Sequence, residues 1–238
     1  MTEHIVKSFE EELEVLATTI ARMGGLNEVQ LSAAIDALSK RDVELAERTV
    51  REDQRIDALE HEIETGAVRL IALRQPMASD LREPIAAIKI SSDLERIGDL
   101  SKNIAKRVIV IQDDFEIPIR LMQGLVRMGR LALGQLKQVL DSYSNRDPQV
   151  ALDVWKSDEE IDEMYNSIFR ELLTYMMEDP RTIGACTHLL FIAKNIERIG
   201  DHTTNVAESV HYLVTGERLV ELRPKSDKTS ETSINMRE

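Results

Sequence analysis

Apolar residues recur at three- and four-residue steps along most of the chain, which is the spacing of one face of an α-helix. The first such segment runs from His4 to about Lys40. Its phase continues through Gly24-Gly25, so the pattern favours one long helix that is weakened at the glycine pair. Two helices broken at Gly25 are the alternative.

The same periodicity predicts five more helices, with aspartate or proline at most of their ends. They run from a cap at Asp42 to about Arg74, from Ser79 or Asp80 to the Asp113-Asp114 pair, from Pro118 to about Ser142, from a cap at Asp147 to Met177, and from Asp179-Pro180 to about Val214, near Gly216. Pro84 lies in the opening turn of its helix, where proline is tolerated. The sequence therefore predicts an all-α protein.

One motif occurs twice, and it indicates internal repetition. Glu-Arg-Ile-Gly-Asp stands at Glu95–Asp99 and again at Glu197–Asp201. A second acidic pattern, Asp-x-x-x-Asp, begins at Asp53 in the second helix and at Asp158 in the fifth. We therefore expect two tandem, pseudo-symmetric three-helix bundles. Residues 1–114 form the first, residues 115–216 form the second, and residues 217–238, which lack apolar periodicity, form a disordered tail.

The composition of the chain argues against several classes of protein. The net charge of -13 argues against non-specific nucleic-acid binding. The single cysteine, Cys186, excludes an intramolecular disulfide. The first residues lack the pattern of a signal peptide and no apolar run has the length of a membrane span, so a cytoplasmic, soluble protein is expected.

The repeated acids suggest a metal site. Helices joined by short turns pack as antiparallel neighbours, so the second and third helices of each unit can bring their acids together. The predicted ligands are Asp53, Asp57, Glu95 and Asp99 in the first unit, and Asp158, Asp162, Glu197 and Asp201 in the second, and Asn103, His202 and Asn205 could complete the coordination shell. Oxygen ligands suit magnesium, calcium, manganese or ferric iron, which would offset the repulsion between these carboxylates.

Other interpretations of the acids stay open. They can form a solvated surface, with Arg96 and Arg198 as their positive partners and no metal. A di-metal enzyme of the ferritin-like kind is disfavoured, because such sites use a Glu-x-x-His motif that is missing here. Gly98 and Gly200 lie inside predicted helices, where they would allow close approach of a neighbouring helix or of bridging ions.

These motifs together resemble the PhoU family of phosphate-signalling regulators. The resemblance covers about residues 4–215. It rests on Phe9–Leu13, on Arg74-Gln75-Pro76 followed by Ser79–Arg82, and most strongly on the repeated Glu-Arg-Ile-Gly-Asp.

The resemblance implies two tandem three-helix bundles with metal clusters at the eight acids named above. The bound ions would be iron, manganese, magnesium or zinc. It also implies a homodimeric, non-enzymatic negative regulator of the phosphate-starvation response and of phosphate uptake. Such a protein links the ATPase subunit of a phosphate ABC transporter to a sensor histidine kinase. From the net charge of -13 we expect no nucleic-acid binding, and we expect association with an anionic membrane only through these protein partners.

Overall fold

The computed structural model describes residues 2–112 and 119–219, and within these ranges the chain contains helices and no strand. The helices are α1 (Thr2–Lys40), α2 (Val43–Glu52), α3 (Gln54–Arg74), α4 (Arg82–Val110), α5 (Ile119–Asn145), α6 (Pro148–Lys156), α7 (Asp158–Glu178) and α8 (Ile183–Thr215), with short 3₁₀ turns at Ala78–Leu81 and Pro180–Thr182. The prediction of an all-α protein is confirmed.

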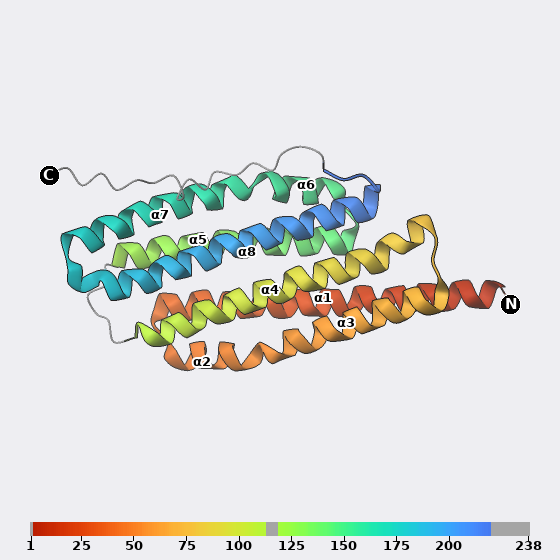
Figure 1. The fold of residues 1–238 in the computed structure, drawn as a ribbon, viewed down its shortest axis with the longest axis horizontal. Helices are drawn as coiled ribbons and strands as arrows, with labels where there is room; N and C mark the ends of the chain where they lie inside the picture. Colours follow the sequence, from red (N-terminus) through yellow and green to blue (C-terminus); the bar gives the residue numbers. More distant parts are fainter. Residues whose placement is uncertain (1, 113–118, 220–238) are drawn as a thin grey trace.

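The helices form two similar units that lie along one another (Figure 1). In each unit a long helix (α1 or α5) is followed by a kinked one (α2–α3 or α6–α7) and then by a second long helix (α4 or α8). The helices α4 and α8 lie side by side at the centre, and apolar side chains of both units form one buried cluster. The predicted tandem three-helix bundles are thus confirmed, and they share a single core.

Helix α1 is continuous through the glycine pair, so the alternative of a break at Gly25 is wrong. Gly24 faces the second unit, and a Cβ atom placed there would lie 2.5 Å from Cδ2 of Leu140 on α5. The reverse contact also exists, because a Cβ on Gly129 of α5 would lie 2.8 Å from Cγ1 of Ile35 on α1. Each glycine therefore provides the space into which a large side chain of the other unit packs.

The second and fifth predicted helices are each two helices in the structure, which corrects the expectation of unbroken segments. The first break falls at Asp53, between α2 and α3, and the second at Ser157, between α6 and α7. Apolar periodicity continues across both breaks, which is why the sequence pattern did not reveal them. Both breaks lie at the acidic motifs.

The turn between the first two helices is built in the same way in both units. Arg41 and Arg146 adopt a left-handed backbone with φ 53°. Asp42 then caps α2 by accepting a hydrogen bond from the Leu45 amide at 2.9 Å, and Asp147 caps α6 in the same manner. The predicted caps at Asp42 and Asp147 are confirmed.

Some predicted features lie outside the described residues, including the Asp113-Asp114 helix end, the Pro118 helix start and the tail beyond residue 219. At the end of the second unit, α8 stops at Thr215 and Gly216 takes the left-handed conformation with φ 77°. Within the described part of the chain, none of the helices has a stretch apolar and long enough to traverse a bilayer.

Candidate functional site

The predicted acidic residues are positioned by the two helix breaks and by the middle of α4 and α8. Gly98 and Gly200 allow this contact, because each lies against the broken helix of its own unit. A Cβ on Gly98 would lie 3.1 Å from Cδ1 of Ile56, and a Cβ on Gly200 would lie 3.4 Å from Oδ1 of Asp158. The predicted role of these glycines in helix approach is confirmed.

A glutamine from the first helix of each unit reaches each break. Gln30 on α1 donates through Nε2 to Oδ1 of Asp53 at 2.9 Å. Gln135 on α5 donates to the carbonyl oxygen of Ser157 at 2.9 Å and to its hydroxyl at 3.0 Å. Kinks form where a side chain takes over a backbone partner of the helix, so Gln135 stabilises the break between α6 and α7.

The first acidic centre, at Asp53, Asp57, Glu95 and Asp99, contains its own cation. The Lys102 ammonium lies 2.5 Å from Oδ2 of Asp53 and 2.5 Å from Oδ1 of Asp99. Burial alone would lower the pKa of Lys102, but its hydrogen bonds to these two carboxylates and their charges together raise it. Lys102 therefore stays protonated, and both oxygens of the buried Asp53 have partners.

Burial and neighbouring charges shift the pKa values of the other two acids of this centre, Asp57 and Glu95. Burial raises the pKa of Asp57, and the charges of Asp53 and Asp99 add to the rise against the opposing effect of Lys102. Burial also raises the pKa of Glu95, and the charge of Asp99 is the next largest cause. The charges of these acids thus act on one another, and Lys102 supplies positive charge among them.

The second acidic centre, at Asp158, Asp162, Glu197 and Asp201, is more deeply buried and has a different cation. Glu197 is only 5% exposed. Its Oε1 lies 2.9 Å from the Lys194 ammonium, but its Oε2 accepts no hydrogen bond from the described residues. Burial raises the pKa of Glu197 to about 7, and the charges of Asp201 and Asp162 contribute against the effect of Lys194.

The two centres differ at one equivalent position. Lys102 stands three residues after Asp99, and Thr204 stands three residues after Asp201. The Thr204 hydroxyl has the Gly200 carbonyl oxygen as its acceptor at 2.8 Å and lies 3.3 Å from Oδ1 of Asp158, so a neutral group replaces the ammonium group. At this position the first centre therefore has an ammonium group and the second has a hydroxyl.

Among the described residues, no three acidic, histidine or cysteine side chains are arranged as a metal site. His202 and Asn205 contact Asp93 on α4, with both nitrogen-to-Oδ1 distances near 3 Å, at 2.9 Å and 3.1 Å respectively. They thus join the two units rather than the acids of their own unit, and Asn103 is exposed. A cation fits the second centre, where a buried oxygen is orphaned, better than the first, where Lys102 would have to be displaced.

Sequence reasoning did not identify Lys102, Gln30, Gln135 or Lys194. A signal for the first three was available in the repeat itself. Gln135 follows Gln30 at the same separation at which Asp158 follows Asp53, and aligning the two Glu-Arg-Ile-Gly-Asp motifs sets Lys102 against Thr204. Lys194 stands one turn before Glu197, which is a weaker signal because ion pairs at this spacing are common on helix surfaces.

Fold and site together define a class of protein, an all-helical bundle of two repeats with a paired-carboxylate centre at the kinked helix of each repeat. The chain belongs to the PhoU family, whose PhoU domain matches residues 20–108 and again residues 125–210.

Known relatives match over nearly the whole chain. A phosphate-specific transport system accessory protein PhoU homolog of Caulobacter vibrioides is 56% identical over 97% of this chain and 100% of that protein. A homolog with the same description from Rhizobium meliloti is 52% identical over 95% of both chains. The crystal structure of PhoU from Pseudomonas aeruginosa superposes with a TM-score of 0.84 at 38% identity, covering 88% of this chain and 100% of that one.

Membership of this family of accessory proteins confirms the prediction of a regulatory rather than a catalytic protein. The ferritin-like alternative is set aside on the same ground.

Proposed function

We propose that this chain is a regulatory adaptor of phosphate uptake that represses the phosphate-starvation response when phosphate is plentiful. The observation that carries the proposal is the 56% identity, over 97% of the chain, to a phosphate-specific transport system accessory protein. Its partners are the ATPase subunit of a phosphate ABC transporter and a sensor histidine kinase. It acts in the cytoplasm as a homodimer and reaches the membrane through these proteins.

The charge of the molecule supports protein partners over other ones. A net charge of -13 disfavours approach to nucleic acid and to anionic lipid. The same charge favours partner surfaces that are basic, because complementary potentials speed association and select partners. Binding by the adaptor should therefore weaken as salt concentration rises.

A bound cation forms the second part of the proposal. The residues that would hold it are Asp158, Asp162, Glu197 and Asp201 in the second centre, and Asp53, Asp57, Glu95 and Asp99 remain the candidate ligands of the first. The orphaned Oε2 of Glu197 and the raised pKa of this residue support a cation at the second centre. A metal ion would supply positive charge that offsets the repulsion between carboxylates on α7 and α8.

The regulatory role is tested in a strain that lacks its own copy of the gene. We expect a phosphate-repressed reporter to be active in phosphate-rich medium in that strain and to be silenced again when this chain is expressed. Purified chain should also bind the ATPase subunit in a pull-down at low salt. Unchanged reporter activity with and without the chain, together with no binding to the ATPase subunit, would refute the adaptor role.

The metal proposal is tested by elemental analysis of protein purified without chelator. We expect bound metal in the parent and its loss in the double variant Asp99→Asn with Asp201→Asn. Glu197→Gln alone should remove most of it if the second centre is the main site. Equal metal in the parent and in the double variant would show that these acids are not the ligands.

A metal-free scaffold makes a different prediction. Thermal stability would then be the same with and without added divalent or ferric ions, and the acids would serve only as surface or packing residues. The reporter experiment does not depend on this result, so regulation and metal binding can fail separately.

A further inference from the structure

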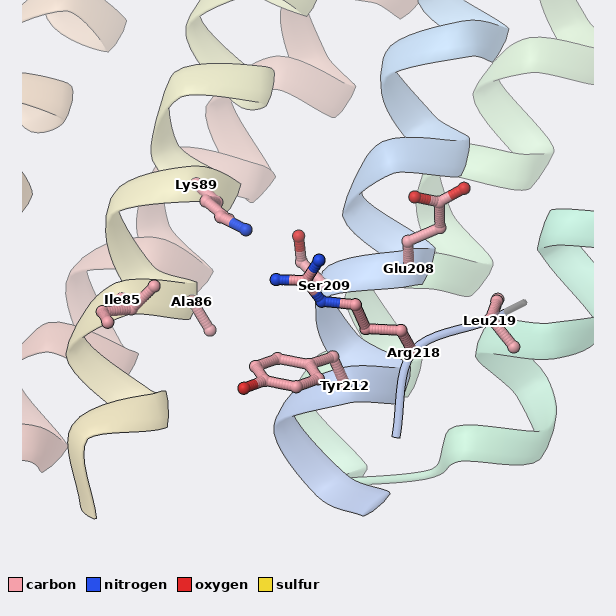
Figure 2. Close-up of a pocket in the computed structure, with 8 residues that line it drawn as sticks. All are labelled: Ile85, Ala86, Lys89, Glu208, Ser209, Tyr212, Arg218 and Leu219. Atoms are coloured by element: carbon pink, nitrogen blue, oxygen red, sulfur yellow. The ribbon is translucent and has the colours of Figure 1, made fainter. Parts of the chain in front are cut away.

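A small concavity lies between the start of α4 and the end of α8, away from both acidic centres. It has a volume of about 230 Å³. One wall comes from α4 of the first unit, the other from α8 of the second unit and from the residues that follow it (Figure 2). The space is at the lower end of ligand pockets and suits a small ion more than a large organic ligand.

Two cationic side chains line this space. The Lys89 ammonium from α4 and the Arg218 guanidinium from the segment after α8 point toward one another beside Ser209 (Figure 2). Within residues 2–112 and 119–219, no ion pair or hydrogen bond is recorded for either group. Two like charges facing each other across a small cavity repel unless an anion lies between them.

Two carboxylates near the cavity contact other residues. Glu208 also lines the concavity, but its Oε1 accepts a hydrogen bond from the Trp155 indole at 2.9 Å. Glu83, at the start of α4, forms an ion pair with Arg146. The indole is neutral, so Glu208 keeps its charge, and the side chains that line the cavity carry two positive charges against one negative.

Additional groups suit an oxyanion. Ser209 lies beside both cationic groups and carries a hydroxyl donor, whereas the Tyr212 ring lines the cavity with its hydroxyl pointing toward the start of α4 (Figure 2). A third cation, Arg82, lies with its guanidinium carbon 5.9 Å from the centre of the Tyr212 ring, which adds to the positive potential. Arginine presents a planar fork of donors that matches phosphate oxygens, while lysine acts as a point charge.

We propose that the cavity between α4 and α8 binds a phosphate-type dianion, held by Lys89 and Arg218 with Ser209 as a hydroxyl donor. Phosphate presents acceptor oxygens to both cationic groups and to the Ser209 hydroxyl at once, whereas a carboxylate has only two oxygens. The ligand is either free inorganic phosphate or the phosphoryl group of a small molecule. Because Lys89 belongs to the first unit and Arg218 follows the second, the bound anion would also tie the two units together.

The inference is tested by titrating purified full-length chain with inorganic phosphate at about pH 8, where phosphate is mostly dianionic. Isothermal titration should give one saturable site, and added phosphate should raise the melting temperature, since a ligand that binds only the folded state stabilises it. Sodium chloride at equal ionic strength is the control for screening. Adenosine monophosphate is the second ligand, and tighter binding of it would assign the site to a phosphoryl group of a nucleotide rather than to the free anion.

The double variant Lys89→Gln with Arg218→Gln should weaken phosphate binding at least about tenfold, because both charged donors are lost. The matched control is Lys106→Gln with Arg198→Gln, which makes the same change in net charge at exposed positions of α4 and α8. It should bind phosphate as the parent does. The two double variants should melt at similar temperatures without phosphate, because all four side chains are exposed.

No saturable binding of either phosphate or adenosine monophosphate to the parent would overturn the proposal. Equal loss of binding in both double variants would do so as well, because it would assign the effect to net charge rather than to the cavity. This binding experiment is independent of the reporter experiment, so the anion site can fail while the regulatory role stands.

Discussion

At the scale of single residues, Lys102 and Thr204 make the two repeats chemically different. Both stand on the same helical face as the acids before them. Lys102 gives the first centre a permanent internal cation, whereas Thr204 gives the second centre a neutral hydroxyl at the equivalent position. The repeat has thus kept its acids and changed the group that balances them.

Substitution of Lys102 or Thr204 by the residue of the other repeat should change both stability and metal binding. Lys102→Thr is expected to lower the free energy of unfolding by about 2–3 kcal/mol in chelator-treated protein, because the buried Asp53 loses its cation. It should also raise the amount of metal that the protein binds. Urea unfolding and elemental analysis measure the two effects.

Two variants serve as comparisons for Lys102→Thr. Lys106→Thr, at an exposed position of the same helix, controls for loss of charge and of helix propensity. Thr204→Lys should reduce metal binding at the second centre, because it places an ammonium there. If Lys102→Thr is as stable as Lys106→Thr, Lys102 does not hold the first centre together.

Glu197 should make stability depend on pH in metal-free protein. Its pKa rises from the usual 4.5 to about 7 on folding, so between these values the folded state holds a proton that the unfolded chain has released. This contribution to stability is therefore complete below about pH 4.5 and is lost as pH rises through about 7.

Replacing the carboxyl group removes this dependence. Relative to the parent, Glu197→Gln should be nearly neutral at about pH 4.5 and more stable by about 2 kcal/mol at about pH 8. Unfolding by urea at several pH values measures the difference. Glu160→Gln on the exposed side of α7 is the control, and equal pH profiles for the two variants would contradict the buried position of Glu197.

At the scale of helices, the glycines of α1 and α5 differ in whether the packing between the two units requires them. Gly24 and Gly129 are separated by the same interval as Asp53 and Asp158, and each receives a large side chain of the other unit, Leu140 or Ile35. Gly25 has nothing within 4 Å of an added Cβ. One glycine of the pair is therefore required by packing and the other is not.

Alanine substitution should distinguish the glycine that packing requires from the one that it does not. Gly25→Ala is expected to stabilise the protein by about 0.5–1 kcal/mol, because alanine favours the helix and meets no obstacle. Gly24→Ala gains the same propensity but must push Leu140 aside, so it should be less stable than Gly25→Ala by about 1 kcal/mol or more. Urea unfolding of the two single variants measures this, and equal stabilities would show that α1 and α5 do not pack as described.

At the scale of the whole molecule, the two repeats behave as one body because α4 and α8 join them. Oδ1 of Asp93 on α4 accepts a hydrogen bond from the Asn205 side-chain amide and lies 2.9 Å from Nδ1 of His202, and both of these residues are on α8. The Arg107 guanidinium of α4 lies 4.1 Å from the centre of the Phe191 ring on α8 and also contacts His188. Together with the shared apolar cluster, these contacts cross the boundary between the repeats.

A shared core predicts cooperative unfolding. Urea unfolding followed by far-ultraviolet circular dichroism, which reports all helices, should coincide with the fluorescence of Trp155, the only tryptophan, on α6 of the second repeat. Expression of residues 1–114 alone should give a chain that self-associates, because it exposes the buried face of α4. Two separate transitions, or a stable monomeric fragment, would mean that the repeats fold independently.

The sequence by itself determined the helical class, the two repeats, and the caps at Asp42 and Asp147. Each of these follows from spacing along one chain or from a local hydrogen bond, so periodicity and repetition are enough to find them. The continuity of α1 also followed from its apolar phase, although only the packing of Leu140 against Gly24 explains why a glycine is there.

The tertiary structure alone decided the helix breaks and the balance of charge at the two centres. Apolar periodicity crosses Asp53 and Ser157 undisturbed, and the glutamines that reach those breaks come from another helix. The burial that raises the pKa of Glu197, and the meeting of Lys89 with Arg218 across two repeats, depend in the same way on distances between segments far apart in the chain. Such contacts leave no period in the sequence, because the energy of a buried charge is set by what surrounds it in space.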